Sequence, residues 1–244
     1  MSKSIGVFGA GSGLGQAVAH RYAREGYDVA LVARRREPLE LLAKDLAPHG
    51  VAVHVVTADL ADTDAIGDLA ERIRAGVGGL DAFYYGPNSA DPGFTPAADL
   101  TPRQARGFMS ITLYTLVALV QQFLPHMLHQ GDGAVLTAPG ASALQGMPGM
   151  SGPGPALAAQ RNYLQALHAE VAGKGVYVGE LYIGALIADS AVHAGIQAAR
   201  EAGAPVPDWA ATPASPHELA DLLWNMHTAK DRSETVYPAD LFDR

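Results

Sequence analysis

The sequence contains no cysteine among its 244 residues, and it contains lysine at only four positions. The lack of cysteine excludes disulfide bonds, thiolate nucleophiles and cysteine-based metal sites. Acidic residues outnumber basic ones, and the formal net charge is −8. Such a charge disfavours binding to nucleic acid or to an anionic membrane, so we expect neither as a partner.

A long hydrophobic run is also missing. The longest apolar stretch, around Leu113 to Val120, is too short to span a bilayer. The first five residues run directly into a predicted strand and lack the layout of a signal peptide. No Pro/Ser-rich linker, charge block or internal repeat divides the chain. We therefore expect one soluble, cytoplasmic domain that covers residues 1–244.

The nine histidines show no metal-binding pattern. His126 and His129 are three residues apart on a predicted helix, but no carboxylate lies at ligand spacing around them. We interpret the two histidines as a surface pair and expect no metal.

The most informative feature that is present is a glycine-rich turn near the N-terminus. It has the sequence Gly9-Ala10-Gly11-Ser12-Gly13-Leu14-Gly15 and lies between an apolar run at 5–8 and a helix-like run at 16–23. Glycine permits positive φ and a close approach of the backbone to a ligand, while the start of a helix favours a pyrophosphate. A strand, a glycine turn and a helix in this order predict a nucleotide-binding site. The alternative is a tight turn without a ligand.

Strand-like and helix-like patterns alternate along the rest of the chain. This alternation predicts an α/β fold, a Rossmann-type doubly wound parallel sheet of about seven strands flanked by helices. The predicted strands are 4–8, 28–33, 52–57, 82–85, 134–138, 176–182 and 235–237, and the predicted helices are 13–25, 37–47, 63–75, 102–130, 155–173 and 216–229. The segment 184–214, rich in Ala, Gly and Pro, interrupts the pattern. We expect a helical lid over the pocket there, with a plain surface excursion as the alternative.

With these features the chain resembles the short-chain dehydrogenase/reductase family over nearly its whole length. Gly9, Gly13 and Gly15 fall on the three glycines of that family's TGxxxGxG motif, although Phe8 replaces the threonine. The resemblance implies that the turn and the loops after later strands bind the cofactor. The implied cofactor-binding residues here are Gly9, Gly11, Ser12, Gly13, Leu14, Gly15, Asp59, Leu60, Gly86, Pro87 and Gly184.

Three of these positions depend on the resemblance most strongly. Asp59 falls where the family has an aspartate that hydrogen-bonds the adenine, and the alternative is a turn or cap residue. Gly86 is the residue that survives from the family's NNAG motif. Gly184 follows the strand at the point where the family's loop crosses the nicotinamide.

The residues after the second predicted strand favour NADP(H) over NAD(H). A site that prefers NAD has a carboxylate there, whereas in this chain Ala33 is followed by Arg34 and Arg35, and no acid appears before Glu37. A guanidinium group suits a 2′-phosphate, so we expect Arg34 and Arg35 to bind NADP(H). The alternative is that these arginines form a solvated helix start.

The family's catalytic Tyr-x-x-x-Lys pair is absent, because none of the lysines has a tyrosine four positions before it. Alignment of 167–171 with the family's LAxEL places the catalytic positions on residues of other types. The tyrosine and lysine positions fall on Pro153 and Leu157, and the serine and asparagine positions fall on Gly140 and Thr112. A positioned acid or base is typically worth about 10²–10⁴-fold in rate, so its loss has a large consequence.

Other hydroxyl groups could replace the missing proton donor. The candidates are Ser142, Tyr182 and Tyr85, with Ser142 preferred because it lies two residues after the family's serine position. Each of them has a structural role as the alternative. Met147 and Met150 are predicted to line an apolar pocket or to fill loop packing.

Three functional hypotheses follow from the resemblance. The chain is an atypical NADP(H)-dependent oxidoreductase, a catalytically silent NADP(H)-binding sensor or partner subunit, or a dehydratase or isomerase on the same fold. The partner is a small-molecule substrate or none. The predicted helices 102–130 and 155–173 resemble those that pair subunits in this family, so we expect a homodimer or homotetramer, with burial inside the monomer as the alternative.

Overall fold

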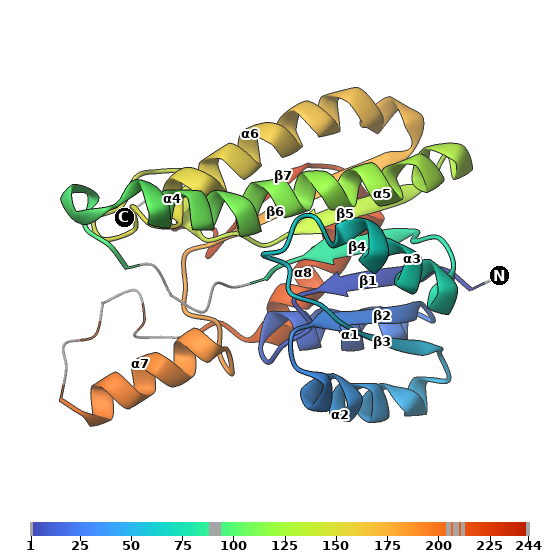
Figure 1. Ribbon diagram of the computed structural model, residues 1–244, viewed down its shortest axis with the longest axis horizontal. Helices are drawn as coiled ribbons and strands as arrows, with labels where there is room; N and C mark the ends of the chain where they lie inside the picture. The colour runs from blue at the N-terminus through green and yellow to red at the C-terminus, as the bar shows by residue number, and fades with distance from the viewer. Residues whose placement is uncertain (1, 88–93, 204–205, 207–209, 211–212, 243–244) are drawn as a thin grey trace.

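The computed structural model describes residues 2–87, 94–203, 206, 210 and 213–242. A seven-stranded, entirely parallel sheet forms its centre (Figure 1), in the order β3-β2-β1-β4-β5-β6-β7. The strands are β1 Ser4–Phe8, β2 Asp28–Ala33, β3 Val53–Thr57, β4 Ala82–Tyr85, β5 Gly133–Thr137, β6 Val176–Ile183 and β7 Glu234–Tyr237. All seven predicted strands are present with small shifts at their ends, and the predicted fold class is confirmed.

Helices cover both faces of the sheet (Figure 1). The core on one face includes buried residues of α1 Leu14–Arg24, α2 Arg36–Leu46 and α8 Pro216–Ala229. The core on the other face includes residues of α3 Ile66–Val77, α5 Thr115–Gln130 and α6 Gly154–Val171. Because both faces are covered, β1, β4, β5 and β6 are buried along their whole length, which explains why they are continuous apolar runs in the sequence.

The strand order reverses between β1 and β4, since β2 lies on one side of β1 and β4 on the other. In open parallel sheets, ligands bind in the crevice at the carboxyl ends of the strands at such a reversal. The glycine turn leaves β1 at this position, so the fold places it at the expected edge.

One long helical rod runs along the sheet from Pro102 to Gln130, interrupted by a single π-helical segment (Figure 1). It consists of α4 Pro102–Met109, the π segment Ser110–Tyr114 and α5. The Thr101 side chain accepts a hydrogen bond from the backbone N–H of Gln104, and the Gln104 side chain accepts one from the backbone N–H of Thr101, which together form a capping box. Sequence periodicity predicted one unbroken helix here and did not reveal the π segment.

This rod is longer than the apolar stretch at 113–120 that the sequence indicated. Among the described residues it is the one helix long and apolar enough, by length and composition, to cross a membrane, with a mean hydropathy of 1.5. Core helices of soluble proteins share that property, and here Leu116, Leu119 and Phe123 are buried against the sheet. The apolar side chains on this face of the helix therefore pack against the sheet.

The segment after β6 contains α7 Ala191–Glu201, which lies apart from the two helical layers (Figure 1). Ser190 caps α7 by accepting a hydrogen bond from the backbone N–H of His193. Several residues between 204 and 212 lie outside the described part of the chain. A helix therefore exists in the segment 184–214, and its role as a lid stays a prediction.

Candidate functional site

The glycine turn is built so that two of its glycines cannot carry a side chain. Gly9 has φ 95°, and its N–H donates to the carbonyl of Val32 at 2.9 Å, which ties the turn to β2. A Cβ on Gly9 would lie 2.7 Å from the carbonyl oxygen of Gly86, and a Cβ on Gly15 would lie 2.1 Å from the carbonyl oxygen of Gly9. Nothing lies within 4 Å of a Cβ on Gly11. The close packing at Gly9 and Gly15 explains why glycine is needed at those positions.

The turn leads directly into the amino end of a helix. Gly13 has φ 87° and precedes α1, which has no side-chain cap and no acidic residue in its first turn. Ser12 is exposed, whereas Leu14 is buried behind the turn. A helix start with unsatisfied N–H groups and a positive dipole end favours an anion such as a phosphate. The residues present therefore fit the pyrophosphate of a dinucleotide.

The segment that contains α7 reaches this turn. The Cα and Cβ atoms of Ser190 lie 3.2 Å from the position that a Cβ on Gly13 would take. A residue that is 177 positions later in the chain thus packs against the glycine turn.

Two exposed arginines follow β2, next to the same edge of the sheet. Arg34 and Arg35 are exposed, and in the part of the chain that the structure describes neither forms an ion pair. Arg36, in contrast, pairs with Glu40 one turn further along α2 at 3.4 Å. Two guanidinium groups without a counterion remain available to an anionic ligand.

Asp59 and Leu60, the predicted cofactor-binding residues after β3, make local contacts in this structure. Asp59 is exposed, and its Oδ1 accepts a hydrogen bond from the backbone N–H of Ala61 at 3.0 Å, which is a turn-forming contact. Leu60 is buried, and its carbonyl accepts a 2.6 Å hydrogen bond from the hydroxyl of Thr115 on α5. The turn interpretation of Asp59 is thus observed, and the contact with adenine stays a prediction.

The other predicted cofactor-binding residues also lie at strand ends. Gly86 N–H donates to the carbonyl of Phe8 at 2.9 Å, and Pro87 follows it at the boundary of the described residues. Gly184 N–H donates to the carbonyl of Tyr237 at 2.7 Å, and a Cβ on Gly184 would clash with Leu241. The predicted residues therefore follow β1 to β4 and β6 along one edge of the sheet.

Two glycines at or beside the predicted catalytic positions lie close to one serine. A Cβ on Gly140, the serine position, would lie 3.8 Å from the Oγ of Ser142 and 3.9 Å from the Leu157 side chain. A Cβ on Gly154, the neighbour of Pro153, would lie 4.0 Å from the same Oγ. Ser142 is 5% exposed, and its Oγ is a buried oxygen without a hydrogen-bond partner among the described residues. The Ser142 hydroxyl thus lies close to Gly140 and Gly154, and its place in a catalytic site stays a prediction.

The fourth position, Thr112, lies in the π segment and is connected to α6 by a residue that sequence analysis missed. The buried Gln160 side chain donates from Nε2 to the carbonyl oxygen of Thr112 at 2.7 Å. Its place three residues after Leu157 on the same helix is the sequence signal that could have identified it. This contact satisfies a backbone carbonyl that the π turn frees.

The two phenol candidates already donate hydrogen bonds. The Tyr85 hydroxyl donates to the carbonyl of Ile111, and burial raises the pKa of this phenol. The Tyr182 hydroxyl donates to Glu234 Oε1 at 3.2 Å, and burial again raises the pKa of the phenol. Each phenol holds its proton more tightly than an exposed tyrosine, which is unfavourable for proton transfer near neutral pH.

Tyr182 belongs to a polar cluster beneath α6. Arg161 forms a two-point ion pair with Glu234, with N–O distances of 3.0 and 2.9 Å, and Gln165 also donates to Glu234. Glu180 faces this cluster from β6, 2% exposed, with a buried Oε2 that has no partner among the described residues. Burial raises the pKa of the Glu180 carboxyl to about 8, so it is largely protonated at neutral pH.

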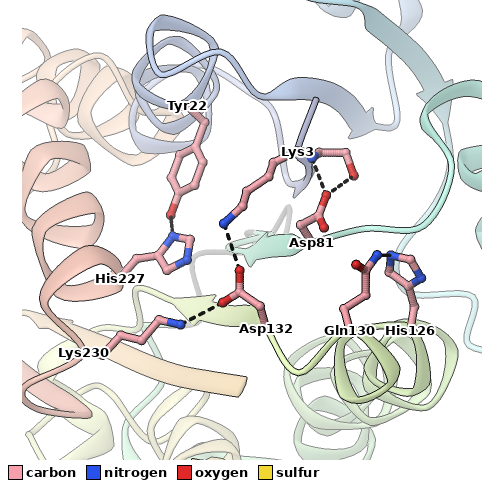
Figure 2. A network of polar contacts seen from close by, with 9 residues as sticks. Lys3, Tyr22, Asp81, His126, Gln130, Asp132, His227 and Lys230 are labelled. Atoms are coloured by element: carbon pink, nitrogen blue, oxygen red, sulfur yellow. Dashed lines mark hydrogen bonds and ion pairs between the residues drawn. The ribbon is translucent and has the colours of Figure 1, made fainter. Parts of the chain in front are cut away.

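The opposite edge of the sheet carries a separate polar network (Figure 2). Asp132 bridges Lys3 and Lys230 at 2.9 and 3.0 Å, and these ammonium groups lower the pKa of Asp132 to about 2. The Tyr22 hydroxyl and His227 Nδ1 are 2.8 Å apart, and burial lowers the pKa of His227 to about 4. This network lies at the amino ends of the strands and ties them together, away from the glycine turn. No cluster of metal-ligating side chains was found in the described ranges.

A cavity of about 560 Å³ opens beside Ser142, between the loop after β5 and the start of α6. Its lining includes Ser142, Met147, Met150 and Ser151. Both methionines therefore line a pocket, as the sequence predicted. The cavity lining also includes Gly154, the neighbour of the predicted tyrosine position Pro153, so this cavity is the candidate substrate pocket.

Comparisons with known proteins agree with this arrangement. A family model described as short chain dehydrogenase matches residues 3–198. The chain is 30% identical over 184 residues to the sulfoacetaldehyde reductase of Chromohalobacter salexigens, a match that covers 74% of this chain and 71% of that protein. It is 29% identical over 178 residues to a very-long-chain 3-oxoacyl-CoA reductase of Anas platyrhynchos, covering 70% of this chain and 56% of that protein.

The fold is similar to that of a solved reductase. The structure of L-sorbose reductase from Gluconobacter frateurii, complexed with NADPH and L-sorbose, matches with a TM-score of 0.85 at 22% sequence identity. That match covers 100% of this chain and 97% of the reductase.

Proposed function

Because this chain belongs to the short-chain dehydrogenase family, we propose that it is an NADP(H)-dependent oxidoreductase whose proton transfer does not use the family's tyrosine and lysine. The observation that carries the proposal is the glycine turn, in which Gly9 and Gly15 exclude any side chain. That backbone is shaped for close approach, and the uncapped start of α1 behind it favours a pyrophosphate.

The preference for NADP(H) rests on the two exposed arginines after β2. Arg34 and Arg35 form no ion pair within the described residues, and the position that carries a carboxylate in NAD-specific sites is basic here. A 2′-phosphate would accept charge-assisted hydrogen bonds from them. The G. frateurii reductase, of the same fold, is complexed with NADPH, which supports this choice.

The bound nicotinamide supplies the hydride, and the protein's own groups position the substrate. We propose the Ser142 hydroxyl as the hydrogen-bond donor to a substrate oxygen, since it has no partner among the described residues and lies near Gly140, the predicted serine position; its buried oxygen would have to become accessible when the substrate binds. A serine hydroxyl does not titrate near neutral pH, so we propose water as the ultimate proton source for the oxygen. Slow turnover follows, because a positioned acid contributes about 10²–10⁴-fold in rate.

A second candidate function is a catalytically silent NADP(H)-binding sensor or partner subunit. It is favoured by the cavity beside Ser142, whose described lining has no side chain that titrates between about pH 4 and 10. Oxidation of NADPH by a carbonyl compound that occurs only in the presence of the protein would identify an enzyme. No such oxidation would favour the sensor.

We further propose that a second copy of the chain covers the groove between α5 and α6, giving a homodimer or homotetramer. This groove of about 370 Å³ is lined by apolar side chains such as Leu124, Leu128 and Tyr163. In the rod Pro102–Gln130, 33% of the most apolar window is buried within the chain. Light scattering at micromolar concentration tests the assembly. The protein is expected to be soluble and cytoplasmic.

The cofactor assignment is tested by calorimetric titration with NADPH and NADH. Replacement of Arg34 and Arg35 by alanine is expected to weaken NADPH binding by about 10- to 100-fold, the equivalent of one or two charge-assisted hydrogen bonds, and to change NADH binding little. Arg36→Ala is the matched control, because Arg36 already pairs with Glu40. A wild-type protein that shows neither heat of binding nor a thermal shift with NADPH refutes the proposal.

A further inference from the structure

The start of α7 is capped through a histidine. Ser190 Oγ accepts a hydrogen bond from the backbone N–H of His193 at 3.0 Å. In return, His193 Nδ1 accepts a hydrogen bond from the backbone N–H of Asp189 at 3.1 Å. Reciprocal pairs of this kind at helix starts ordinarily have Glu or Gln at the position of His193. Glutamine keeps its acceptor oxygen at every pH, whereas a histidine loses its acceptor nitrogen when it gains a proton.

These hydrogen bonds define the protonation state of the imidazole. A backbone N–H can only donate, so Nδ1 of His193 carries no proton and the proton lies on Nε2. Nε2 is 3.1 Å from Nε2 of Gln197, and a half-turn of this amide brings its oxygen there as the acceptor. The cap therefore requires a neutral imidazole. A second proton would set Nδ1–H against the N–H of Asp189 and place a positive charge at the amino end of a helix, both of which are unfavourable.

The surroundings of the cap offer little to stabilise the protonated form. Within the part of the chain described, the imidazole is bonded to a backbone N–H and to an amide, and not to a carboxylate. The Asp189 carboxylate, next to the cap in the chain, belongs to an exposed residue. Residues 9–17, in the glycine turn and the first turn of α1, have no ionisable side chain. The segment also pairs with the residue just before the cap of α8, whose first turn has His217 and Glu218 as its titratable residues. The apolar cluster at α7 consists of Leu186, Val192, Ile196, Val206 and Ala210.

The cap fixes the residue that meets the glycine turn. The Cα and Cβ atoms of Ser190 lie 3.2 Å, and its backbone nitrogen 3.4 Å, from the position that a Cβ on Gly13 would take. Gly13 immediately precedes α1, whose uncapped start is the proposed pyrophosphate site. Asp189 has φ 60°, which is uncommon for a residue with a side chain, and its N–H is bonded to His193. Because α7 lies apart from the two helical layers (Figure 1), the bonds of its first turn contribute directly to the position of Ser190.

We infer that His193 is a positioning residue for the glycine turn: as a neutral imidazole it holds Ser190 against Gly13, and its protonation releases this contact. The consequence for NADP(H) rests on the proposed function, whereas the cap and its contact with the turn do not. Histidine side chains ordinarily gain a proton near pH ~6.5. Acidification through this range is expected to open the cap and to weaken cofactor binding.

The cap is tested by NMR without cofactor, at about pH 5.5 and about pH 7.5, in the wild type and in His193→Gln. In the wild type, the exchange protection of the Asp189 and His193 amides, corrected for intrinsic rates, is expected to be about fivefold lower at the lower pH, the equivalent of one helix cap. The Gly13 amide resonance should shift over the same range. His193→Gln keeps an acceptor at both pH values and should show neither change. Equal protection in the wild type at both pH values, or a Gly13 resonance that ignores acidification, overturns the inference.

The effect on the cofactor is measured by calorimetric titration with NADPH at the same two pH values. The 2′-phosphate of NADPH also titrates in this range, so the affinity of the wild type is compared with that of His193→Gln at each pH. The two proteins should agree within about twofold at the higher pH, and the variant should bind about threefold to tenfold more tightly at the lower pH. His193→Ala, which lacks the acceptor, should bind more weakly than His193→Gln at both. His217→Gln, which removes the imidazole at the start of α8, is the matched control and should behave as the wild type.

The two measurements separate this inference from the proposed function. A wild type that binds NADPH as tightly as His193→Gln at the lower pH overturns the positioning role and leaves the cofactor assignment intact. Absence of NADPH binding in every variant refutes the proposed function. The exchange protection and the Gly13 resonance, recorded without cofactor, then support or overturn the action of His193 on the turn.

Discussion

The glycine turn after β1 and the start of α6 lie on the same edge of one sheet, but their glycines differ in how tightly they are packed. At the turn, Gly9 and Gly15 leave no space for a single additional carbon atom. At the start of α6, Gly140 and Gly154 have room for one, since the nearest atoms to an added Cβ lie 3.6 Å or more away. The backbone of the turn is thus tightly packed at Gly9 and Gly15, whereas Gly140 and Gly154 are loosely packed.

The difference shows how binding and proton transfer can be separated within one fold. Phosphate binding depends on backbone N–H groups and glycine geometry, which the strand–turn–helix unit maintains as part of its packing. Proton transfer depends on a few side chains whose loss leaves the backbone unchanged. The loop after β5 and the start of α6, residues 138–158, contain neither a tyrosine nor a lysine.

The strongest test of this comparison restores the missing groups. The triple substitution Gly140→Ser, Pro153→Tyr and Leu157→Lys is expected to raise the NADPH-dependent reduction of a neutral ketone by about 10²–10⁴-fold, because a lysine lowers the pKa of a neighbouring phenol. The rate is measured as NADPH oxidation at saturating ketone.

The matched control carries phenylalanine in place of tyrosine at 153, with the other two substitutions unchanged. It has the same bulk and lacks only the hydroxyl, so it should stay near the wild-type rate. A triple variant that melts normally and binds NADPH, but reacts no faster than this control, would show that loss of the pair is not what limits turnover.

The second test alters the glycine turn after β1. Gly15→Ala places a Cβ 2.1 Å from the carbonyl of Gly9 and is expected to weaken NADPH binding by at least tenfold. Gly67→Ala is the matched control, since Gly67 is also in a helix and has nothing within 4 Å. That control should bind normally and gain up to about 1 kcal/mol in unfolding free energy. Equal NADPH affinities for both variants would contradict the importance of the turn.

The contrast between the regions also explains what the sequence could predict. Strands such as β1 and β6 are buried on both faces, so their apolar runs identified them directly. The capping hydroxyl of Thr101 marked the start of α4 because it acts within four residues. Local patterns of this kind, together with the glycine turn, were sufficient for the fold.

The parts that were missed depend on contacts between distant segments. The π segment Ser110–Tyr114 has no local signature, and its free carbonyl is satisfied by Gln160 from another helix. The charged groups around Glu180 are likewise remote in sequence, because Glu234 comes from β7 and Arg161 from α6. Partners of buried polar groups are a property of packing and are not encoded in sequence spacing.

The last and smallest test concerns the buried acid that remains beneath α6. Burial raises the pKa of Glu180 from 4.5 to about 8 in the folded protein, so the folded state keeps a proton that the unfolded state loses. Unfolding free energy therefore falls as pH rises between about 4.5 and 8, and this loss is complete above pH 8.

Glu180→Gln removes the titrating group while keeping the size of the side chain. The variant is expected to match the wild type near pH 5 and to exceed it by roughly 2 kcal/mol at pH 9, a value set below the full shift because the buried amide also needs partners. Urea unfolding at five pH values measures the difference, with the exposed Glu71→Gln as control. Parallel pH profiles for the wild type and Glu180→Gln would mean that Glu180 is ionised in the folded protein. The region beneath α6 would then retain a buried charge, and the comparison with the glycine turn would have to be revised.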